Sequence, residues 1–348
     1  MYRLKVNTSR KYTVTVADDF SAFTEEVLPL IKGEKVAIIT DDRVAALYPD
    51  ALDGFLTDKT VYKLVIRHGE KSKNAKNYIS LINALAERGF SREDAVIALG
   101  GGVVGDLAGF VASTYMRGIT LIALPTTLLS MIDSSVGGKT AIDLKYGKNL
   151  CGTFYQPSAV YINTQFLKTL PEREIKNGLG ETVKYALLSD TVGIKDLEDP
   201  TAALTVYKCL KIKRDVVVKD EKENGLRALL NLGHTVGHSV EKLSGFTLPH
   251  GVAVAKGLYA AIGVSAILYG LSAEATEKMR KVAALSGVKR GVKYSAEEIA
   301  ENIFADKKRR GDHIYFVGIK SVGCPSIEKI PIGKLKELLI KAEKELWI

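Results

Sequence analysis

The stretch Ala95-Val-Ile-Ala-Leu-Gly-Gly-Gly-Val-Val-Gly-Asp106 decides the fold of the first part of this chain. Its first five residues form an apolar, β-rich run that leads directly into a glycine-rich turn, and we expect a helix to begin near Val104. The G-x-G-x-x-G string in this turn would let the backbone approach a pyrophosphate at a helix N-terminus. Close packing of a strand against a helix also selects glycine, so the string alone is equally compatible with a structural turn.

Similar β-rich runs occur on both sides of this strand, at residues 36–40, 61–66 and 120–124, with helical patterns between them. This alternation predicts an α/β, Rossmann-like domain with a largely parallel sheet over residues 1–163. From residue 164 onward strand runs nearly vanish, and helical spacing is found at residues 173–188, 202–219, 251–269 and 332–346. We therefore predict a mostly α-helical second domain over residues 164–348.

The composition of the chain is that of an ordinary globular protein. Of its 348 residues, 46% are hydrophobic and 26% charged. A chain of this length can form two hydrophobic cores. The net charge of +9 is scattered along the sequence, and the one dense basic run, residues 307–310, has no interleaved aromatic residues and lies between Asp306 and Asp312. We therefore expect no nucleic-acid partner.

The sequence also indicates where the protein works. The N-terminus lacks a signal-peptide pattern, and the three cysteines form no C-x-x-C pair, so we expect a cytoplasmic protein without disulfides. Residues 251–273 are apolar, but they contain Lys256 and follow a polar histidine motif. This segment predicts a buried core helix and no membrane span.

Two polar features accompany the glycine-rich turn. The usual dinucleotide fingerprint has an acidic residue about 20 positions further on, but here that stretch ends in Leu124-Pro-Thr-Thr127, and the best acidic candidate is Asp41 at the end of an earlier strand. The run from Thr126 to Asp143 combines hydroxyls, glycines, a carboxylate and Lys139. Its Gly-Gly-Lys-Thr string lacks the first glycine of a nucleoside-triphosphatase loop, so we expect contact with a phosphorylated or polyhydroxylated ligand.

Three of the five histidines, His234, His238 and His250, lie close together in the sequence. The first two are four residues apart and would share one face of a helix, and imidazole is a common ligand of zinc. The metalloprotease motif H-E-x-x-H is excluded because residue 235 is Thr. A carboxylate from another segment could complete a metal site, and the helical stretch around Glu174 and Glu181 could supply it or could equally face solvent.

These motifs and others along the chain resemble those of the 3-dehydroquinate synthase family, within the sugar-phosphate cyclase superfamily, and they occur in the same order. The resemblance covers nearly the whole chain and rests on Gly69-Glu70-x-x-Lys73, the turn at 100–110, Tyr115-x-Arg117-Gly118, residues 125–143, Gly147-Lys-Asn149, Tyr155-Gln-Pro157, Thr169-Leu-Pro-x-Arg-Glu174, Glu181-x-x-Lys184, Asp220-Glu-x-Glu-x-Gly-x-Arg227, Asn231-x-Gly-His234-x-x-x-His238, His250-Gly251 and Asp306-Lys-Lys308.

The resemblance implies an NAD- and metal-dependent enzyme of the shikimate pathway, which serves aromatic amino acid biosynthesis. Such an enzyme converts 3-deoxy-D-arabino-heptulosonate 7-phosphate to 3-dehydroquinate and phosphate by transient oxidation, phosphate elimination, re-reduction and intramolecular aldol closure. The implied metal is zinc, with cobalt as a second option, and its implied ligands are Glu181, His234 and His250. The implied NAD+ contacts are Asp41, Glu70, Lys73, Gly101, Gly102, Val103, Asp106, Thr126, Thr127, Lys148, Thr169, Leu170 and Glu174.

The resemblance further implies roles toward the substrate. The implied catalytic residues are Asp133, Lys184 and His238. The implied substrate-binding residues are Arg117, Lys139, Asn149, Lys213, Arg227, Asn231, His238 and one of Lys307 and Lys308. Arg117 matches an arginine that reaches the site of a neighbouring subunit, which implies a homodimer. Arg227 and Lys213 would bind the substrate carboxylate, since a guanidinium matches a carboxylate with two hydrogen bonds.

The chain departs from the family pattern in two places. Val252 stands where a glutamate usually follows His-Gly, and the spacer between Lys184 and Lys213 is short. Two alternatives stay open. One is another cyclase, such as a 2-deoxy-scyllo-inosose or epi-valiolone synthase, whose substrate lacks the carboxylate. The other is a metal-dependent glycerol-phosphate or polyol dehydrogenase.

Overall fold

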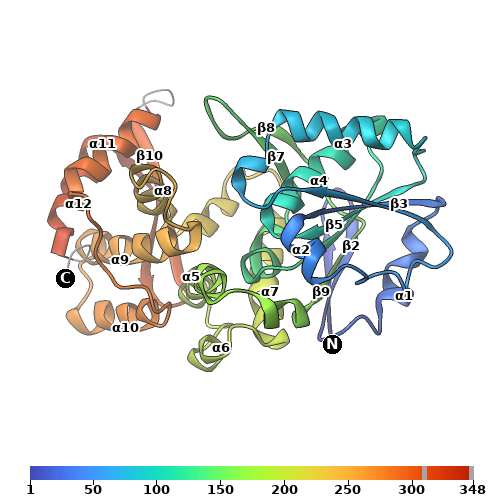
Figure 1. The fold of residues 1–348 in the computed structure, drawn as a ribbon. Coiled ribbons are helices and arrows are strands. Elements are labelled where there is room, and N and C mark those ends of the chain that lie inside the picture. Colours follow the sequence, from blue (N-terminus) through green and yellow to red (C-terminus); the bar gives the residue numbers. More distant parts are fainter. Residues whose placement is uncertain (308–311, 345–348) are drawn as a thin grey trace. The chain divides into compact units, whose positions relative to one another are not determined.

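The chain forms two compact units, residues 1–170 and 171–348, and the computed structural model describes residues 1–307 and 312–344 (Figure 1). The first unit is built around a parallel-rich sheet, and the second is mostly helical. The predicted fold class is therefore confirmed. The two units meet in the sequence at Leu170 and Pro171, a few residues after the predicted boundary, because the short helix η5, Thr164–Thr169, belongs to the first unit.

A seven-stranded sheet forms the centre of the first unit, in the order β1-β2-β9-β6-β5-β3-β4. All neighbouring strands pair in parallel except β1 and β2. The strands are β1 Tyr2–Asn7, β2 Lys11–Ala17, β3 Lys35–Asp41, β4 Thr60–Ile66, β5 Ala95–Gly100, β6 Thr120–Pro125 and β9 Ala159–Asn163. The four strands predicted from sequence are β3 to β6. The other three were not predicted, since β1 alternates buried and exposed residues and β9 is a run of only five residues.

Helices cover this sheet and place its apolar residues in a core. The helices are α1 Phe23–Glu26, α2 Asp42–Leu47, α3 Ala75–Glu87 and α4 Gly102–Thr114, with short turns η1 Leu28–Leu30, η2 Glu70–Ser72 and η3 Tyr115–Arg117 and a π-helical turn η4 Ser130–Ser134. Leu85 of α3 and Leu107 of α4 are fully buried and pack in one cluster with Val96 of β5. The antiparallel hairpin of β7, Lys139–Leu144, and β8, Gly147–Phe154, lies against α4.

The second unit is a helical bundle with one β-hairpin. Its helices are α5 Glu172–Leu188, α6 Ile194–Glu198, α7 Ala203–Lys219, α8 His234–Leu243, α9 His250–Tyr269, α10 Ala273–Ala284, α11 Ala296–Lys307 and α12 Ile332–Lys341, with the short turn η6 Leu226–Asn231. The hairpin joins β10, His313–Ser321, to β11, Cys324–Pro331. This hairpin was not predicted, because the helical spacing of the flanking segments is the stronger pattern in this part of the sequence.

Helix α9 lies at the centre of the second unit and contacts α5, α8, α10, α12 and β10. By length and composition it is a candidate to cross a membrane, but 72% of its most apolar 18-residue stretch is buried inside the protein. This burial is what the predicted core helix requires. In the part of the chain that the structure describes, Cys151, Cys209 and Cys324 are not joined by disulfide bonds.

Candidate active site

Glycines let three helices of the second unit touch at their backbones. A Cβ atom added to Gly180 of α5 would lie 2.0 Å from the carbonyl oxygen of Gly251 of α9, and one added to Gly251 would lie 1.8 Å from the carbonyl oxygen of Asn177. A Cβ on Gly257 would lie 2.0 Å from the carbonyl oxygen of Gly233, which precedes α8. No side chain fits at such distances, so glycine is required wherever α9 crosses α5 and the start of α8.

These crossings bring the candidate metal ligands together. Glu181 follows Gly180, His250 precedes Gly251, and His234 begins α8, so each lies beside a backbone contact. The ligand atoms of His234, His238 and His250 lie within 4.8 Å of one another. Oε1 of Glu181 lies 3.4 Å from Nε2 of His234 and 3.3 Å from Nε2 of His250. The histidines and the distant glutamate therefore form one cluster in the folded unit.

Hydrogen bonds at Nδ1 set the direction of two of these rings. Nδ1 of His234 lies 3.2 Å from the carbonyl oxygen of Leu232, and Nδ1 of His250 lies 3.2 Å from Oε2 of Glu241. Since an oxygen can only accept, each Nδ1 carries the proton, and in the neutral ring the lone pair is on Nε2, on the side of Glu181. A carboxylate or carbonyl behind a histidine ring is the usual support of a metal-binding imidazole.

Glu181 is the least exposed carboxylate of the cluster, with 0% of its surface accessible. Neither carboxylate oxygen receives a hydrogen bond of regular geometry, although Nζ of Lys184 lies 2.6 Å from Oε2. Burial would raise the pKa of Glu181, but the Lys184 ammonium and the neighbouring imidazoles hold it well below its usual range. A buried carboxylate ion with unsatisfied oxygens facing two imidazole nitrogens suits a divalent cation.

The pKa values of the two histidines differ because their neighbours differ. Burial lowers the pKa of His234 to about 3, so its ring is neutral and can bind a metal. At His250 burial acts in the same direction, but the nearby carboxylates of Glu181 and Glu241 outweigh it and raise the pKa to about 10. Positive charge is thus favoured at Nε2 of His250, where a bound metal ion would replace the proton.

Two buried cations lie in the same unit. Lys213 of α7 is 5% exposed and Arg227 of η6 is 3% exposed. Asp220 shapes the loop before Arg227 by accepting its backbone N–H at 2.9 Å, and a guanidinium nitrogen of Arg227 donates to the carbonyl oxygen of Glu221. Asn231, at the end of η6, donates from Nδ2 to Oε1 of Glu223 at 3.2 Å. Asn231 and Glu223 were both in the motifs of the sequence, but only Asn231 was assigned a role there.

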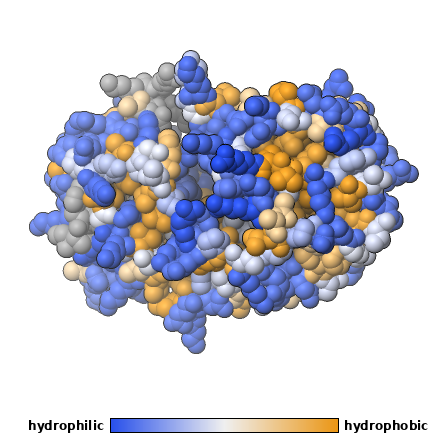
Figure 2. Space-filling view, in the orientation of Figure 1, coloured by the Kyte–Doolittle hydropathy of each residue, from blue (hydrophilic) through white to orange (hydrophobic). Residues whose placement is uncertain are grey.

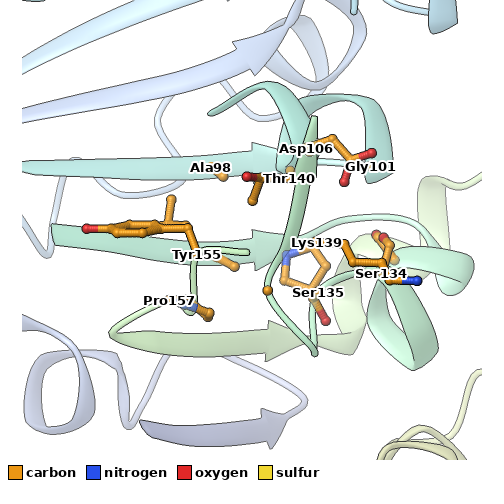
Figure 3. Close-up of a pocket in the computed structure, with 16 residues that line it drawn as sticks. Ala98, Gly101, Asp106, Ser134, Ser135, Lys139, Thr140, Tyr155 and Pro157 are labelled. Atoms are coloured by element: carbon orange, nitrogen blue, oxygen red, sulfur yellow. The ribbon is translucent and has the colours of Figure 1, made fainter. Parts of the chain in front are cut away.

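The glycine-rich turn of the first unit lines a pocket at the carboxyl ends of β5 and β6. Gly101 of the turn and Asp106 of α4 line the pocket together with Ser134 of η4 and Lys139 at the start of β7. Figure 3 shows these residues around the pocket. Helix α4 begins at Gly102, two residues before the expected start, so the backbone N–H groups of Gly102 and Val103 are in its first turn.

The glycines of this turn do different things. A Cβ on Gly100 would lie 2.6 Å from Cβ of Val104, and one on Gly101 would lie 3.0 Å from Cγ2 of Thr127. A Cβ on Gly105 would meet no neighbouring segment within 4 Å. Packing therefore requires glycine at position 100 and is tight at position 101, whereas Gly105 leaves open space beside the pocket that it lines.

Lys73 connects several candidate residues of the first unit. Its side chain is 4% exposed, and Nζ lies 2.8 Å from Oδ2 of Asp106, 2.5 Å from Oδ1 of Asn149 and 3.5 Å from Oε1 of Glu70. Burial would lower the pKa of Lys73, but Asp106, Glu70 and Asp143 outweigh it and raise the pKa, so the ammonium stays charged. The remote motifs around Lys73, Asp106 and Asn149 thus meet at one buried cation.

The remaining candidate cofactor residues lie at helix starts and strand ends. Asp41 ends β3 and caps α2 by accepting the backbone N–H groups of Arg43 and Val44 at 3.0 and 3.1 Å. Thr126 and Thr127 follow β6, and Oγ1 of Thr169 lies 2.6 Å from the hydroxyl of Tyr48. The other members are Lys148 in β8, Leu170 after η5 and Glu174 in the first turn of α5.

The remaining candidates are Asp133, Arg117 and one of Lys307 and Lys308. Asp133 lies in the π-helical turn η4, a feature often found at functional sites. Arg117 and the preceding Met116 have positive φ values, 68° and 46°. Lys308 and the side chain of Lys307 lie outside the described residues.

Sequence reasoning missed one residue of the histidine cluster. Glu241, which supports the ring of His250, is on α8 three residues after His238 and seven after His234. This helical spacing places it on the face of α8 that carries both histidines, and that signal was available from the sequence.

The chain is similar to known proteins over most of its length. Residues 63–177 match the family model described as 3-dehydroquinate synthase N-terminal, and residues 178–309 match the one described as 3-dehydroquinate synthase C-terminal. The 3-dehydroquinate synthase of Clostridium acetobutylicum is 42% identical over 319 residues, covering 88% of this chain and 89% of that protein. That of Thermococcus kodakarensis is 42% identical over 320 residues, covering 90% and 92%.

Solved structures show the same fold. A 2-deoxy-scyllo-inosose synthase complexed with carbaglucose-6-phosphate, NAD+ and Co2+ superposes with a TM-score of 0.87 at 24% identity, covering 98% of this chain and 99% of that one. A 2-epi-5-epi-valiolone synthase from Streptomyces hygroscopicus subsp. jinggangensis with NAD+ and Zn2+ bound gives 0.85 at 23% identity, covering 99% of each chain. From the two family models and the relatives at 42% identity, the chain belongs to the 3-dehydroquinate synthase family.

Proposed function

We propose that the chain is a 3-dehydroquinate synthase, which converts 3-deoxy-D-arabino-heptulosonate 7-phosphate to 3-dehydroquinate and inorganic phosphate. The observation that carries the proposal is the cluster of three histidines around the buried Glu181 in a chain whose two halves match the two models of this family. Substrate and products are at the same oxidation level, so the nicotinamide cofactor is regenerated in every turnover.

The metal and NAD+ belong to this proposal. Glu181, His234 and His250 would hold a divalent metal, with zinc as the physiological ion, and the solved synthases of the same fold carry Zn2+ or Co2+ together with NAD+. When bound, the metal would polarise substrate hydroxyls and NAD+ would reversibly accept a hydride. The glycines at the start of α4 suit a pyrophosphate, because the first turn of a helix offers unpaired N–H groups. The full set of proposed NAD+ contacts is the one that the resemblance implies.

The chain's own residues would position the substrate near the metal. Lys184 is 1% exposed and lies against Glu181, so its ammonium would orient a substrate hydroxyl while also holding the ligand carboxylate. His238 lies within the histidine cluster and would contact the substrate. Asp133 would hold a further hydroxyl. Much of the catalysis would come from positioning, because the late steps are easy once the geometry is fixed.

Two groups of residues would recognise the charged ends of the substrate. Lys213 and Arg227 would bind the carboxylate, and the burial of both cations raises their value for recognising an anion. Lys139, Asn149 and Asn231 would bind the phosphate, together with Arg117 and one of Lys307 and Lys308. The presence of both Lys213 and Arg227 favours dehydroquinate synthase over cyclases whose substrates lack that group.

A homodimer is the proposed assembly, with Arg117 contributing to the site of the partner. Apolar surface is visible on the α/β unit in Figure 2. Met116, beside Arg117, is an exposed apolar side chain of this unit. Three more lie on the β7–β8 hairpin: Tyr146 is 88% exposed, Leu150 62% and Phe154 46%. Burial of such side chains against a second copy would be favourable. Sedimentation of the wild type and of Leu150→Lys checks this, and a monomeric wild type would contradict it.

A cytoplasmic location remains a prediction from the N-terminal sequence and the cysteines.

The test is a comparison of two substrates. Wild-type protein with NAD+ and zinc should release phosphate from the heptulosonate phosphate and form 3-dehydroquinate, and it should release far less from glucose 6-phosphate, which has no carboxylate. Arg227→Ala should lower kcat/KM for the heptulosonate phosphate by about 100-fold or more, since it removes a charge-assisted hydrogen-bonding partner. The proposal is wrong if glucose 6-phosphate is the better substrate or if Arg227→Ala leaves turnover intact.

A further inference from the structure

Asp143 near the end of β7 has no role in the function proposed above, yet its carboxylate lies at the centre of a polar network. The pairing of β7 with β8 is irregular between Ile142 and Leu144, and the extra residues lie on β8, where residues 148–150 face Asp143 alone. Such an irregularity changes the direction of side chains relative to the regular alternation of a strand. Here Oδ1 of Asp143 accepts the backbone N–H of Asn149 at 2.8 Å, from the facing strand.

Asn149 needs this support because its backbone is unusual. Its φ is 57°, in the left-handed region that non-glycine residues rarely adopt, although asparagine tolerates it better than most. A carboxylate that accepts the backbone N–H stabilises this conformation by a charge-assisted hydrogen bond. The backbone of Asn149 is thus fixed from the side of Asp143.

Lys73 fixes the side chain of the same residue. Nζ of Lys73 lies 2.5 Å from Oδ1 of Asn149, and an ammonium can only donate, so the amide oxygen of Asn149 must face Lys73. The Nδ2 group is then the part of the amide left to donate to a ligand, and a donor is what a phosphate oxygen requires. Asn149 is exposed, so a ligand can reach it.

Asp143 also holds Lys73 in place. Its backbone N–H donates to the carbonyl oxygen of Lys73 at 2.8 Å, and its Oδ1 lies 3.9 Å from Nζ of Lys73. One residue therefore connects to both the backbone of Asn149 and the lysine that orients the amide of Asn149.

From this geometry we infer that Asp143 is a positioning residue for the phosphate of the substrate, acting through Asn149 and not by touching substrate itself. The inference rests on the proposed function, in which Asn149 binds that phosphate. It predicts that loss of the Asp143 acceptor weakens substrate binding and leaves the cofactor and the chemical step nearly unaffected.

Steady-state kinetics of two substitutions at this position test the inference. Asp143→Ala should raise KM for the heptulosonate phosphate about ten-fold, because it removes a hydrogen bond to a charged acceptor. It should leave kcat and KM for NAD+ within about two-fold of the wild type. Asp143→Asn keeps an oxygen that can accept the N–H of Asn149 and should restore KM to within about two-fold of the wild type. Should Asp143→Ala not fold, Asp143→Ser, whose hydroxyl is too short to reach, replaces it.

Asp19→Ala is the matched control. Oδ1 of Asp19 accepts the backbone N–H of Ser21 at 2.9 Å in the same unit, so this variant also removes an acceptor, but away from the network. Its kinetic constants should equal those of the wild type. An unchanged KM in Asp143→Ala, or an Asp143→Asn variant as impaired as Asp143→Ala, would overturn the inference.

A second readout does not depend on catalysis. In the protein without ligands, the amide hydrogen of Asn149 should exchange slowly in the wild type and in Asp143→Asn, and about ten-fold or more faster in Asp143→Ala. Equal exchange rates in the wild type and Asp143→Ala would contradict the positioning role. If the wild type fails to turn over the heptulosonate phosphate, the proposed function is wrong, while the exchange experiment still decides the role of Asp143 at Asn149.

Discussion

Glycine serves opposite purposes in the two units. At the crossings of α5 and α9, a Cβ on Gly251 would lie 1.8 Å from the carbonyl oxygen of Asn177, so glycine there removes atoms to let backbones touch. At the start of α4, a Cβ on Gly105 would meet no neighbouring segment within 4 Å, so glycine there keeps space open. The same residue type brings the proposed metal ligands together in one unit and leaves open space beside a pocket in the other.

The role of a glycine in a motif therefore depends on the atoms that surround it. The G-x-G-x-x-G string includes Gly100, which packing requires, and Gly105, which packing does not require. Gly180 and Gly251 belong to no phosphate-binding string, yet they decide where Glu181 and His250 lie. Substitutions at Gly251, Glu241 and Gly105 test this contrast.

Gly251→Ala should be the most damaging substitution. The new methyl group would overlap the carbonyl of Asn177, so α9 must move away from α5, at a cost of about 3 kcal/mol in the free energy of unfolding. The shift would also separate His250 from Glu181, so the protein should purify with little bound metal. Denaturant unfolding and elemental analysis measure the two effects. Gly333→Ala in α12, where a Cβ meets no neighbour within 4 Å, is the matched control and should keep both properties.

Glu241→Ala should have an intermediate effect, restricted to the metal. Without Oε2 of Glu241, the ring of His250 loses the partner of its Nδ1, and affinity for zinc should fall between about 10- and 100-fold. Competition with a chromogenic chelator gives this affinity without an activity assay. Glu241→Gln keeps an acceptor oxygen and should lose less. Equal zinc affinity in wild type and Glu241→Ala would show that Glu241 does not support the ligand.

Gly105→Ala should have the smallest effect and the opposite sign on stability. Alanine is favoured over glycine inside a helix by up to about 1 kcal/mol, and the open space accepts the methyl group, so the protein should become slightly more stable. The same methyl group would occupy space beside the proposed pyrophosphate site, and affinity for NAD+ should fall about ten-fold. Thermal unfolding and NAD+ titration of one preparation measure both. Unchanged NAD+ affinity would assign this glycine to folding alone.

Much of the fold could be predicted because the signals were local. Strands β3 to β6 are apolar runs bounded by turn residues, and α5, α7 and α9 have helical spacing within one residue or two of their observed bounds. The hairpin of β10 and β11 was missed because a β-hairpin of nine and eight residues gave a weaker signal than the helical patterns on either side. Strands β2 and β9 become part of the sheet through pairing between residues distant in sequence, and β1 is attached to it only through its hairpin with β2.

The site was less predictable because it depends on distant contacts. The spacing of His234 and His238 indicated a cluster, and the structure places Glu181, a ligand implied by the resemblance, 3.4 Å from His234. The spacing of Glu241 on α8 indicates the helix face that it shares with the histidines, but nothing local indicates that it supports His250 or that Asp143 accepts a hydrogen bond from Asn149. Both contacts depend on how segments distant in sequence pack, which periodicity does not report.

If the chain oxidises and re-reduces its substrate within one turnover, phosphate and reduced nicotinamide must differ in stoichiometry. Phosphate release from the heptulosonate phosphate and the absorbance of reduced nicotinamide would be followed in the same cuvette, with NAD+ and zinc present and after treatment with chelator. We expect steady phosphate release without accumulation of reduced nicotinamide, abolished by chelator and restored by zinc. Phosphate release that ignores chelator and NAD+, or reduced nicotinamide that accumulates in step with product, would contradict it.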